Sequence, residues 1–176
     1  MTHHKHQSSR RTWLFLAFFT ACMQWAGAFE LPAGAPKGQV LLTVNGNISV
    51  KNTAEAAVFD AELLDALPQK SFITTTPWFK EPTKFTGPLL RDVLQALKAN
   101  GTNIKATALN DYKINIPMQD ALKYDVILAR QVDGKVISVR EKGPLFVIYP
   151  FDSASELRNL TYYSRSIWQL KALSIE

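Results

Sequence analysis

Cysteine and histidine are almost missing from this chain of 176 residues, and their few copies lie near its beginning. The only cysteine is Cys22, and the three histidines are His3, His4 and His6. Residues 29–176 therefore cannot form an internal disulfide or a Cys/His zinc site. They also lack a thiolate nucleophile and the histidine of a Ser-His-Asp triad. Chemistry in this stretch must come from other polar side chains, backbone groups or a bound cofactor.

A strong charge bias is also absent. The formal net charge is +5, but the first 28 residues contain three bases, Lys5, Arg10 and Arg11, and no acid. The remainder has 17 bases and 15 acids, a net charge of +2, with no long run of one sign. A nucleic-acid interface is therefore not expected. The chain also has no phosphate-loop, GxGxxG or calcium-loop motif.

The first 28 residues have the order of a secretory signal peptide. A basic segment ends at Arg11, an apolar segment covers 13–19, and Ala26-Gly27-Ala28 is a small-x-small cleavage pattern. Cleavage after Ala28 would deliver the protein to the periplasm or the exterior and leave no membrane span. An uncleaved anchor is less favoured, because residues 13–28 are interrupted by a glutamine and shorter than the roughly 20 apolar residues of a span.

Two alternatives concern the export route. Residues 9–14 (SRRTWL) resemble the twin-arginine export signal of bacteria, although the apolar segment also suits the general route. Residues 19–22 (FTAC) resemble a lipoprotein box, so lipid anchoring at Cys22 is a second interpretation.

Residues 29–176 are expected to form a single domain in which strands outnumber helices. The patterns predict strands at 40–44, 48–50, 57–59, 71–76, 103–109, 112–116, 125–132, 135–139, 145–149 and 165–173. Helices are expected at 61–67 after an Asp60 cap, at 89–97 after a Thr86 cap, at 118–124 and at 153–159. Asn45-Gly46, Asn110-Asp111 and Asp133-Gly134 are turn pairs. The fold class is therefore α+β (mixed α/β) with several short mixed sheets.

The order of several segments resembles the oxidoreductase molybdopterin-binding domain, which has a sulfite-oxidase-type fold. The segments that carry the resemblance include FITTTPW (72–78), FTGPLLRDVL (85–94), LNDY (109–112), DVILA (125–129) and REKGPL (140–145). The resemblance extends over roughly residues 38–175, and it is closest to small, stand-alone exported members. It implies molybdopterin or a pterin-like anionic compound as the ligand.

One departure from the family pattern bears on chemistry. In catalytic members, a cysteine thiolate that follows the strand here read as 72–76 binds molybdenum. This chain has Thr74, Thr75, Thr76 and Pro77 in that region. A threonine hydroxyl cannot replace a soft thiolate, and the metal would lose its fixed orientation. The sequence therefore argues against bound molybdenum, and no catalytic or metal-binding residue is assigned.

Nine residues are candidates for binding the ligand. They supply hydroxyls, aromatic rings and cations, a mixture that suits a planar anionic compound; they are Thr75, Thr76, Trp78, Asn110, Asp111, Tyr112, Arg140, Lys142 and Arg165. Each also has a purely structural interpretation. The threonines suit a strand, the tryptophan a core, Asn110-Asp111 a turn, and the charges a solvated loop.

The sequence thus favours an exported, non-catalytic ligand-binding or sensing module whose partner is a small anionic ligand or an envelope protein. The alternative is a periplasmic molybdopterin-dependent oxidoreductase with unusual metal coordination. A third hypothesis is an envelope-interaction domain without a ligand.

Overall fold

The computed structural model describes residue 1 and residues 30–176. The predicted cleavage site, Cys22 and, apart from Met1, the predicted signal peptide lie outside the described residues. Within residues 30–176, no helix has the length and apolar character needed to cross a membrane.

The largest sheet has five strands, in the order β2-β1-β11-β5-β6. These are β1 (Leu42–Gly46), β2 (Ala57–Phe59), β5 (Asn103–Ala108), β6 (Lys113–Pro117) and β11 (Leu170–Ile175). The pair β1–β11 is parallel and the other pairs are antiparallel. The sheet is therefore mixed, and β11 is its middle strand.

Two smaller sheets complete the β structure. A four-stranded sheet has the order β3-β4-β8-β9, and β7 pairs with β10 in a two-stranded sheet. The strands are β3 (Gln69–Thr74), β4 (Thr83–Pro88), β7 (Ile127–Ala129), β8 (Gln131–Val132), β9 (Lys135–Val136) and β10 (Phe146–Ile148).

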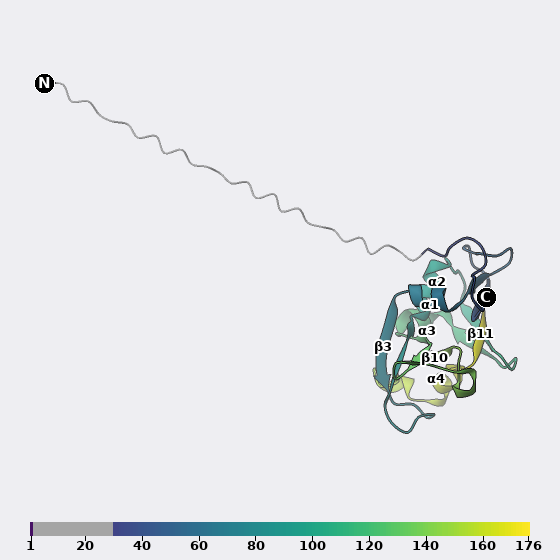
Figure 1. Cartoon of the computed structure of the whole chain (residues 1–176). Helices are drawn as coiled ribbons and strands as arrows, with labels where there is room; N and C mark the ends of the chain where they lie inside the picture. The colour runs from purple at the N-terminus through teal and green to yellow at the C-terminus, as the bar shows by residue number, and fades with distance from the viewer. Residues whose placement is uncertain (2–29) are drawn as a thin grey trace.

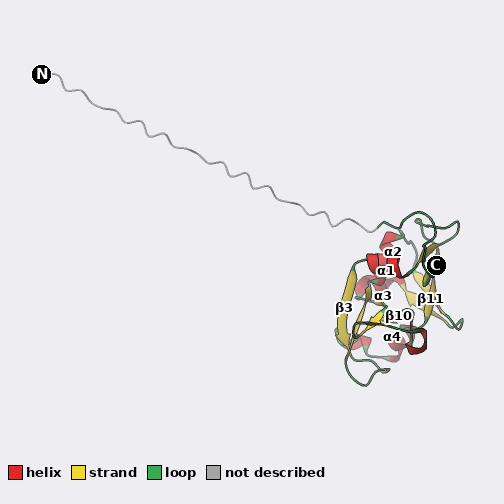
Figure 2. Ribbon diagram, viewed as in Figure 1, coloured by secondary structure: helices red, strands yellow, loops and turns green. Residues whose placement is uncertain are grey.

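Short helices connect the sheets (Figure 2). They are α1 (Ala61–Ala66), α2 (Leu90–Ala96), α3 (Met118–Lys123), α4 (Leu160–Arg165) and the 3-10 helices η1 (Val139–Glu141) and η2 (Ser155–Leu157). The helices α1 and α2 lie at one end of the fold and α4 at the other (Figure 1). This combination confirms the predicted α+β class.

Two clusters of buried side chains hold the sheets together, and the β7–β10 pair lies between them. Leu128 and Val147 belong to the larger cluster with the five-stranded sheet, whereas their neighbours Ile127, Phe146 and Ile148 belong to the smaller one. Successive residues of a strand point to opposite faces, so a strand buried on both faces must be apolar throughout. This explains the uninterrupted apolar runs at 126–129 and 145–149.

Several local predictions are confirmed. The Asp60 carboxylate caps α1 by accepting a hydrogen bond from the Leu63 amide at 3.0 Å, and it also accepts one from the Gly38 amide at 2.9 Å. These bonds lower the pKa of Asp60. Asp133 and Gly134 both have positive φ, as the tight turn between β8 and β9 requires.

The expected return strand at 48–50 is wrong. After Gly46 the chain turns away from the sheet, and the amides of Ser49 and Val50 both donate to the carbonyl of Leu97. The neighbours of β1 are instead β2 and the distant β11. A pairing partner so far along the chain leaves no local signal.

The predicted strand at 125–132 is two strands in different sheets, β7 and β8. The break falls at Arg130, which is buried and forms a two-pronged ion pair with Asp65 of α1, at 2.9 and 3.0 Å. Because this partner lies on another element, the alternation of residues around Arg130 does not predict the break.

The chain after Pro150 also differs from the prediction. The expected helix at 153–159 is only the single 3-10 turn η2, and the last strand, predicted at 165–173, begins only at Leu170, after the helix α4 at 160–165. The Asn159 side chain begins α4 by accepting from the amides of Thr161 and Tyr162. The predicted Thr86 cap is likewise wrong, because Thr86 lies within β4 and α2 has no side-chain cap.

Gly87 is a test of the packing of β4 against β7. A Cβ atom at this position would lie 2.7 Å from the carbonyl carbon of Leu128 and 2.9 Å from the Cα of Ala129. Both are backbone atoms of a buried strand, so they cannot move away cheaply. Gly87→Ala should lower the free energy of unfolding by about 3 kcal/mol. Urea denaturation measures the loss, and Lys84→Ala, an exposed position on the same strand, should lose far less.

Candidate functional site

A cleft of about 680 Å³ lies where the loop after β3, the β5–β6 turn and α4 come together. Four aromatic side chains contribute to its walls: Trp78, Tyr112, Tyr163 and Trp168. Its other lining residues are aliphatic or carry uncharged polar groups: Pro77, Ala108, Leu160, Ile167, Asn110, Ser164 and Ser166. The volume is that of a small-molecule site, and so is a mostly apolar lining with a few polar groups.

The loop after β3 is fixed by a contact with a distant loop. The Asp152 carboxylate accepts hydrogen bonds from the Thr75 amide and the Thr75 hydroxyl, each 2.6 Å long. The Asp152 amide in turn donates to the buried Thr74 hydroxyl at 3.1 Å. The bonds from Thr75 are the main reason that the pKa of Asp152 is lowered. We refer to these three contacts as the Thr75–Asp152 latch.

The latch places Trp78 in the middle of an aromatic cluster. The Trp78 ring lies 5.3 Å from Phe146, 6.0 Å from Trp168 and 6.1 Å from Tyr163, measured between ring centroids. The planes meet at steep angles, from 64° to 81°. Edge-to-face packing of this kind is favourable beyond the apolar area that it buries.

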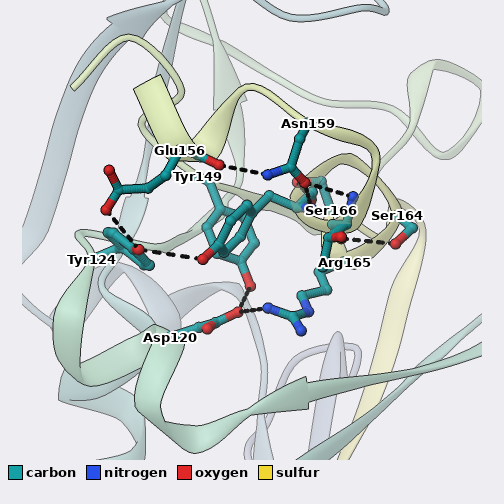
Figure 3. A network of polar contacts seen from close by, with 10 residues as sticks. Asp120, Tyr124, Tyr149, Glu156, Asn159, Ser164, Arg165 and Ser166 are labelled. Atoms are coloured by element: carbon teal, nitrogen blue, oxygen red, sulfur yellow. Dashed lines mark hydrogen bonds and ion pairs between the residues drawn. The ribbon is translucent and has the colours of Figure 1, made fainter. Parts of the chain in front are cut away.

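The helix α4 has two different faces. Leu160, Tyr163 and Ser164 line the cleft, whereas Tyr162 and Arg165 belong to a polar network with Tyr124 and Asp120. Figure 3 shows Arg165 and Asp120 in this network. Arg165 donates from Nη1 to Oδ2 of Asp120 at 2.8 Å.

The hydroxyl of Tyr149 reaches the same Asp120 oxygen, also at 2.8 Å. Asp120 and Tyr149 are both buried. Burial first, and then the negative charge of Asp120, raises the pKa of Tyr149 well above its usual value, so this hydroxyl stays a donor. The cation of Arg165 compensates the buried carboxylate and holds one wall of the cleft.

The outer part of the network joins α3 to the segment before α4 (Figure 3). The Tyr124 hydroxyl donates to Glu156 at 3.2 Å and lies 3.3 Å from the hydroxyl of Tyr162. Lys123 also donates to Glu156, and the hydrogen bonds from Lys123 and Tyr124 lower the pKa of Glu156. Because these groups are largely exposed, their ion pair adds little to stability.

Three of the nine residues predicted to bind a ligand line the cleft together: Trp78, Asn110 and Tyr112. A fourth is close, because the ammonium of Lys142 lies over the ring of Trp168, 4.4 Å from its centroid.

The other five are placed differently, and none of them lines the cleft. Thr75 is engaged by Asp152, and the Thr76 hydroxyl accepts from the Trp78 amide. Asp111 forms an ion pair with Lys171 at 2.7 Å, and Arg165 forms one with Asp120. Arg140 is exposed on η1.

Some residues that shape the site were not predicted. Leu160, Ser164 and Ser166 line the cleft, and Asp120 with Tyr149 anchors its wall. The signal available was weak, because α4 is only six residues long and has no buried residue. An aspartate on the buried side of a predicted helix, at Asp120, was the one clue to an internal ion pair.

An α+β domain with an aromatic-lined cleft is thus the class that the fold and site define. The model of one family, described as the oxidoreductase molybdopterin binding domain, matches residues 41–156. The chain therefore belongs to this family, as the sequence predicted. No curated protein matches the chain.

Family membership suggests a molybdopterin-type cofactor, which has a planar heterocycle, a phosphate and a bound metal. The rings and hydroxyls of the cleft suit a planar heterocycle. The lining contains no cysteine, histidine, carboxylate or cation for a metal or a phosphate. The residues present therefore do not fit the metal part of the cofactor.

The ion pair between Arg165 and Asp120 is a first test of the site. Arg165→Met keeps the length of the side chain but leaves the buried carboxylate without its cation. The free energy of unfolding should fall by about 2–3 kcal/mol, because an uncompensated buried charge is costly. Arg158→Met removes an exposed arginine just before α4 and should cost about 0.5 kcal/mol or less. Equal losses in the two variants, measured by urea denaturation, would contradict the anchoring role of Arg165.

The Thr75–Asp152 latch predicts a dependence on pH. Because the pKa of Asp152 is lowered in the folded protein, its ionised form stabilises the fold above the unfolded pKa of about 3.9. This contribution is lost as pH falls through the folded pKa. The stability difference between the wild type and Asp152→Asn should therefore be largest at neutral pH and shrink below about pH 4.

Thr75→Val should reproduce part of this effect, because it removes the hydroxyl donor and keeps the branched shape. Thr76→Val is the matched control, since the Thr76 hydroxyl accepts from Trp78 rather than contacting Asp152. Denaturation curves from pH 3 to 7 measure all four proteins. A gap for Asp152→Asn that stays constant over this range would show that the latch does not depend on the ionised carboxylate.

Proposed function

We propose that this chain is an exported ligand-binding or sensing module, built on the molybdopterin-binding fold, that does not carry out molybdenum redox chemistry. The observation that carries the proposal is the pair of hydrogen bonds from Thr75 to Asp152. The Thr75 amide and hydroxyl are both committed to Asp152 at the end of the strand where the resemblance places the thiolate ligand. The stretch 30–176 has no cysteine that could take this role from another position.

The chemistry of the cleft supports a binding role. Rings from the loop after β3, from the β5–β6 turn and from the segment after α4 surround a space from which a flat ligand would displace water. Asn110 provides an amide for orientation, whereas the hydroxyls of Ser164 and Ser166 already donate to the carbonyls of Thr161 and Tyr162. No carboxylate, imidazole or thiol among the lining residues is available as a general base or nucleophile. The expected partner is thus a small ligand, and an envelope protein would read the bound state.

The alternative, an oxidoreductase with unusual metal coordination, is favoured by family membership itself. The two functions make different demands on the metal. A redox enzyme needs molybdenum in each active molecule, whereas a binding module needs none.

The test is to purify the exported protein from its own envelope and to measure molybdenum by elemental mass spectrometry and pterin by fluorescence. We expect molybdenum far below one atom per chain. A catalytic family member that has the cysteine, expressed in the same host, is the control for cofactor supply. Near-stoichiometric molybdenum in this chain would overturn the proposal in favour of the alternative. The intact mass of the same sample tests cleavage after Ala28.

A further inference from the structure

We infer that the cleft takes a small planar aromatic compound with a single negative charge, such as an aromatic monocarboxylate. The inference rests on the proposed function, because it names the ligand class of that same site. Three features carry it: the orientation of the rings, the distribution of charge and the one amide that is free to donate.

The rings favour a flat ligand over an aliphatic one. Trp78 meets Trp168 at 76° and Tyr163 at 81°, so the three rings present faces and edges in different directions. Tyr112 adds a half-exposed ring at the β5–β6 turn. An aromatic ligand can therefore stack on one wall and make edge contacts with another, and aromatic pairs in these arrangements are favourable beyond the area that they bury.

The charges favour a ligand with one negative group over a cation or a polyanion. The face of an aromatic ring attracts cations, but here the Lys142 ammonium already lies over the ring of Trp168. A second cation would be repelled by Lys142, and no lining residue is an acid that could compensate it. A phosphate would need several cations, whereas Lys142 is the one cation that contacts the cleft's aromatic wall within the described residues.

A donor is available for the negative group. Asn110 uses its carbonyl oxygen to accept from the Tyr112 amide at 3.2 Å. Among residues 30–176, its side-chain NH₂ has no acceptor, and Asn110 lines the cleft. A carboxylate that enters beside Trp168 would lie near the Lys142 ammonium, which is 4.4 Å from the centroid of that ring, and Asn110 in the lining offers an amide donor.

The experiment compares four probes by isothermal titration calorimetry on the exported protein. Indole-3-acetate, indole and tryptamine share one ring system. The first carries a carboxylate, the second has no side group and the third carries an ammonium. The fourth probe, 3-cyclohexylpropanoate, has the carboxylate without an aromatic ring. We expect indole-3-acetate to bind most tightly, indole more weakly, and tryptamine and the cyclohexyl acid least.

Variants assign the interactions to residues. Lys142→Gln should weaken indole-3-acetate binding about fivefold, the effect of one partly exposed ion pair, and leave indole unchanged. Lys135→Gln is the matched control, because Lys135 is an exposed lysine on β9 that, unlike Lys142, makes no cation–π contact with an aromatic ring of the cleft within the described residues. Tyr112→Leu should weaken both indoles, and because Tyr112 is half-exposed the variant should still fold. Circular dichroism verifies folding in each case.

The outcomes separate failure of the ligand class from failure of the proposed function. If tryptamine binds as tightly as indole-3-acetate, or if the cyclohexyl acid does, the ligand class is wrong. If none of the probes binds to metal-free protein, the ligand class is also wrong, although the proposed function stands whenever pterin is found without molybdenum. Molybdenum near one per chain overturns the proposed function and the ligand class with it.

Discussion

Burial of β7 and β10 on both faces is the constraint on which the rest of the structure depends. Alternate residues of these two strands reach the large core under the five-stranded sheet and the small core under the four-stranded sheet. The same strands support the cleft from below. Phe146 contacts both Trp78 and Trp168, and the chain leaving β10 continues through Tyr149 to Asp152. One apolar strand pair therefore joins the two cores, the anchor of α4 and the latch of the loop after β3.

The cleft is built by residues that mostly do not line it. Asp120, Tyr149 and Asp152 have no place in its lining, yet they hold α4 and the loop that carries Trp78. The polar interactions outside the cleft stabilise its walls, and the apolar rings that line it are available to contact a ligand. Of the charged candidates, Arg165 forms a largely buried ion pair with Asp120 and Asp111 forms an exposed one with Lys171, and neither lines the cleft.

The sequence was sufficient to predict those caps, turns and helices that are determined by interactions between residues close together in the chain. The Asp60 cap, the Asn110-Asp111 and Asp133-Gly134 turns and the helix at 118–123 are each determined by residues a few positions apart. The partner of β1 and the break at Arg130 depend on contacts with residues far along the chain, and no periodicity encodes them. The site follows the same rule.

Within the candidate site, Trp78, Asn110 and Tyr112 were predicted because flat rings and turn amides are conspicuous in the sequence, and the structure places all three in the lining of the cleft. The commitment of Thr75 to Asp152 could not be predicted, because nothing in the sequence connects residues 75 and 152.

A central strand made of residues 170–175 has a kinetic consequence. Thr43 lies beside Ala172, so β1 lacks its parallel neighbour until the chain through residue 175 is available. Pairing of such high contact order is slow, and the waiting strands expose open edges meanwhile. Assembly of the five-stranded sheet is therefore expected to be a slow step in the folding of this domain.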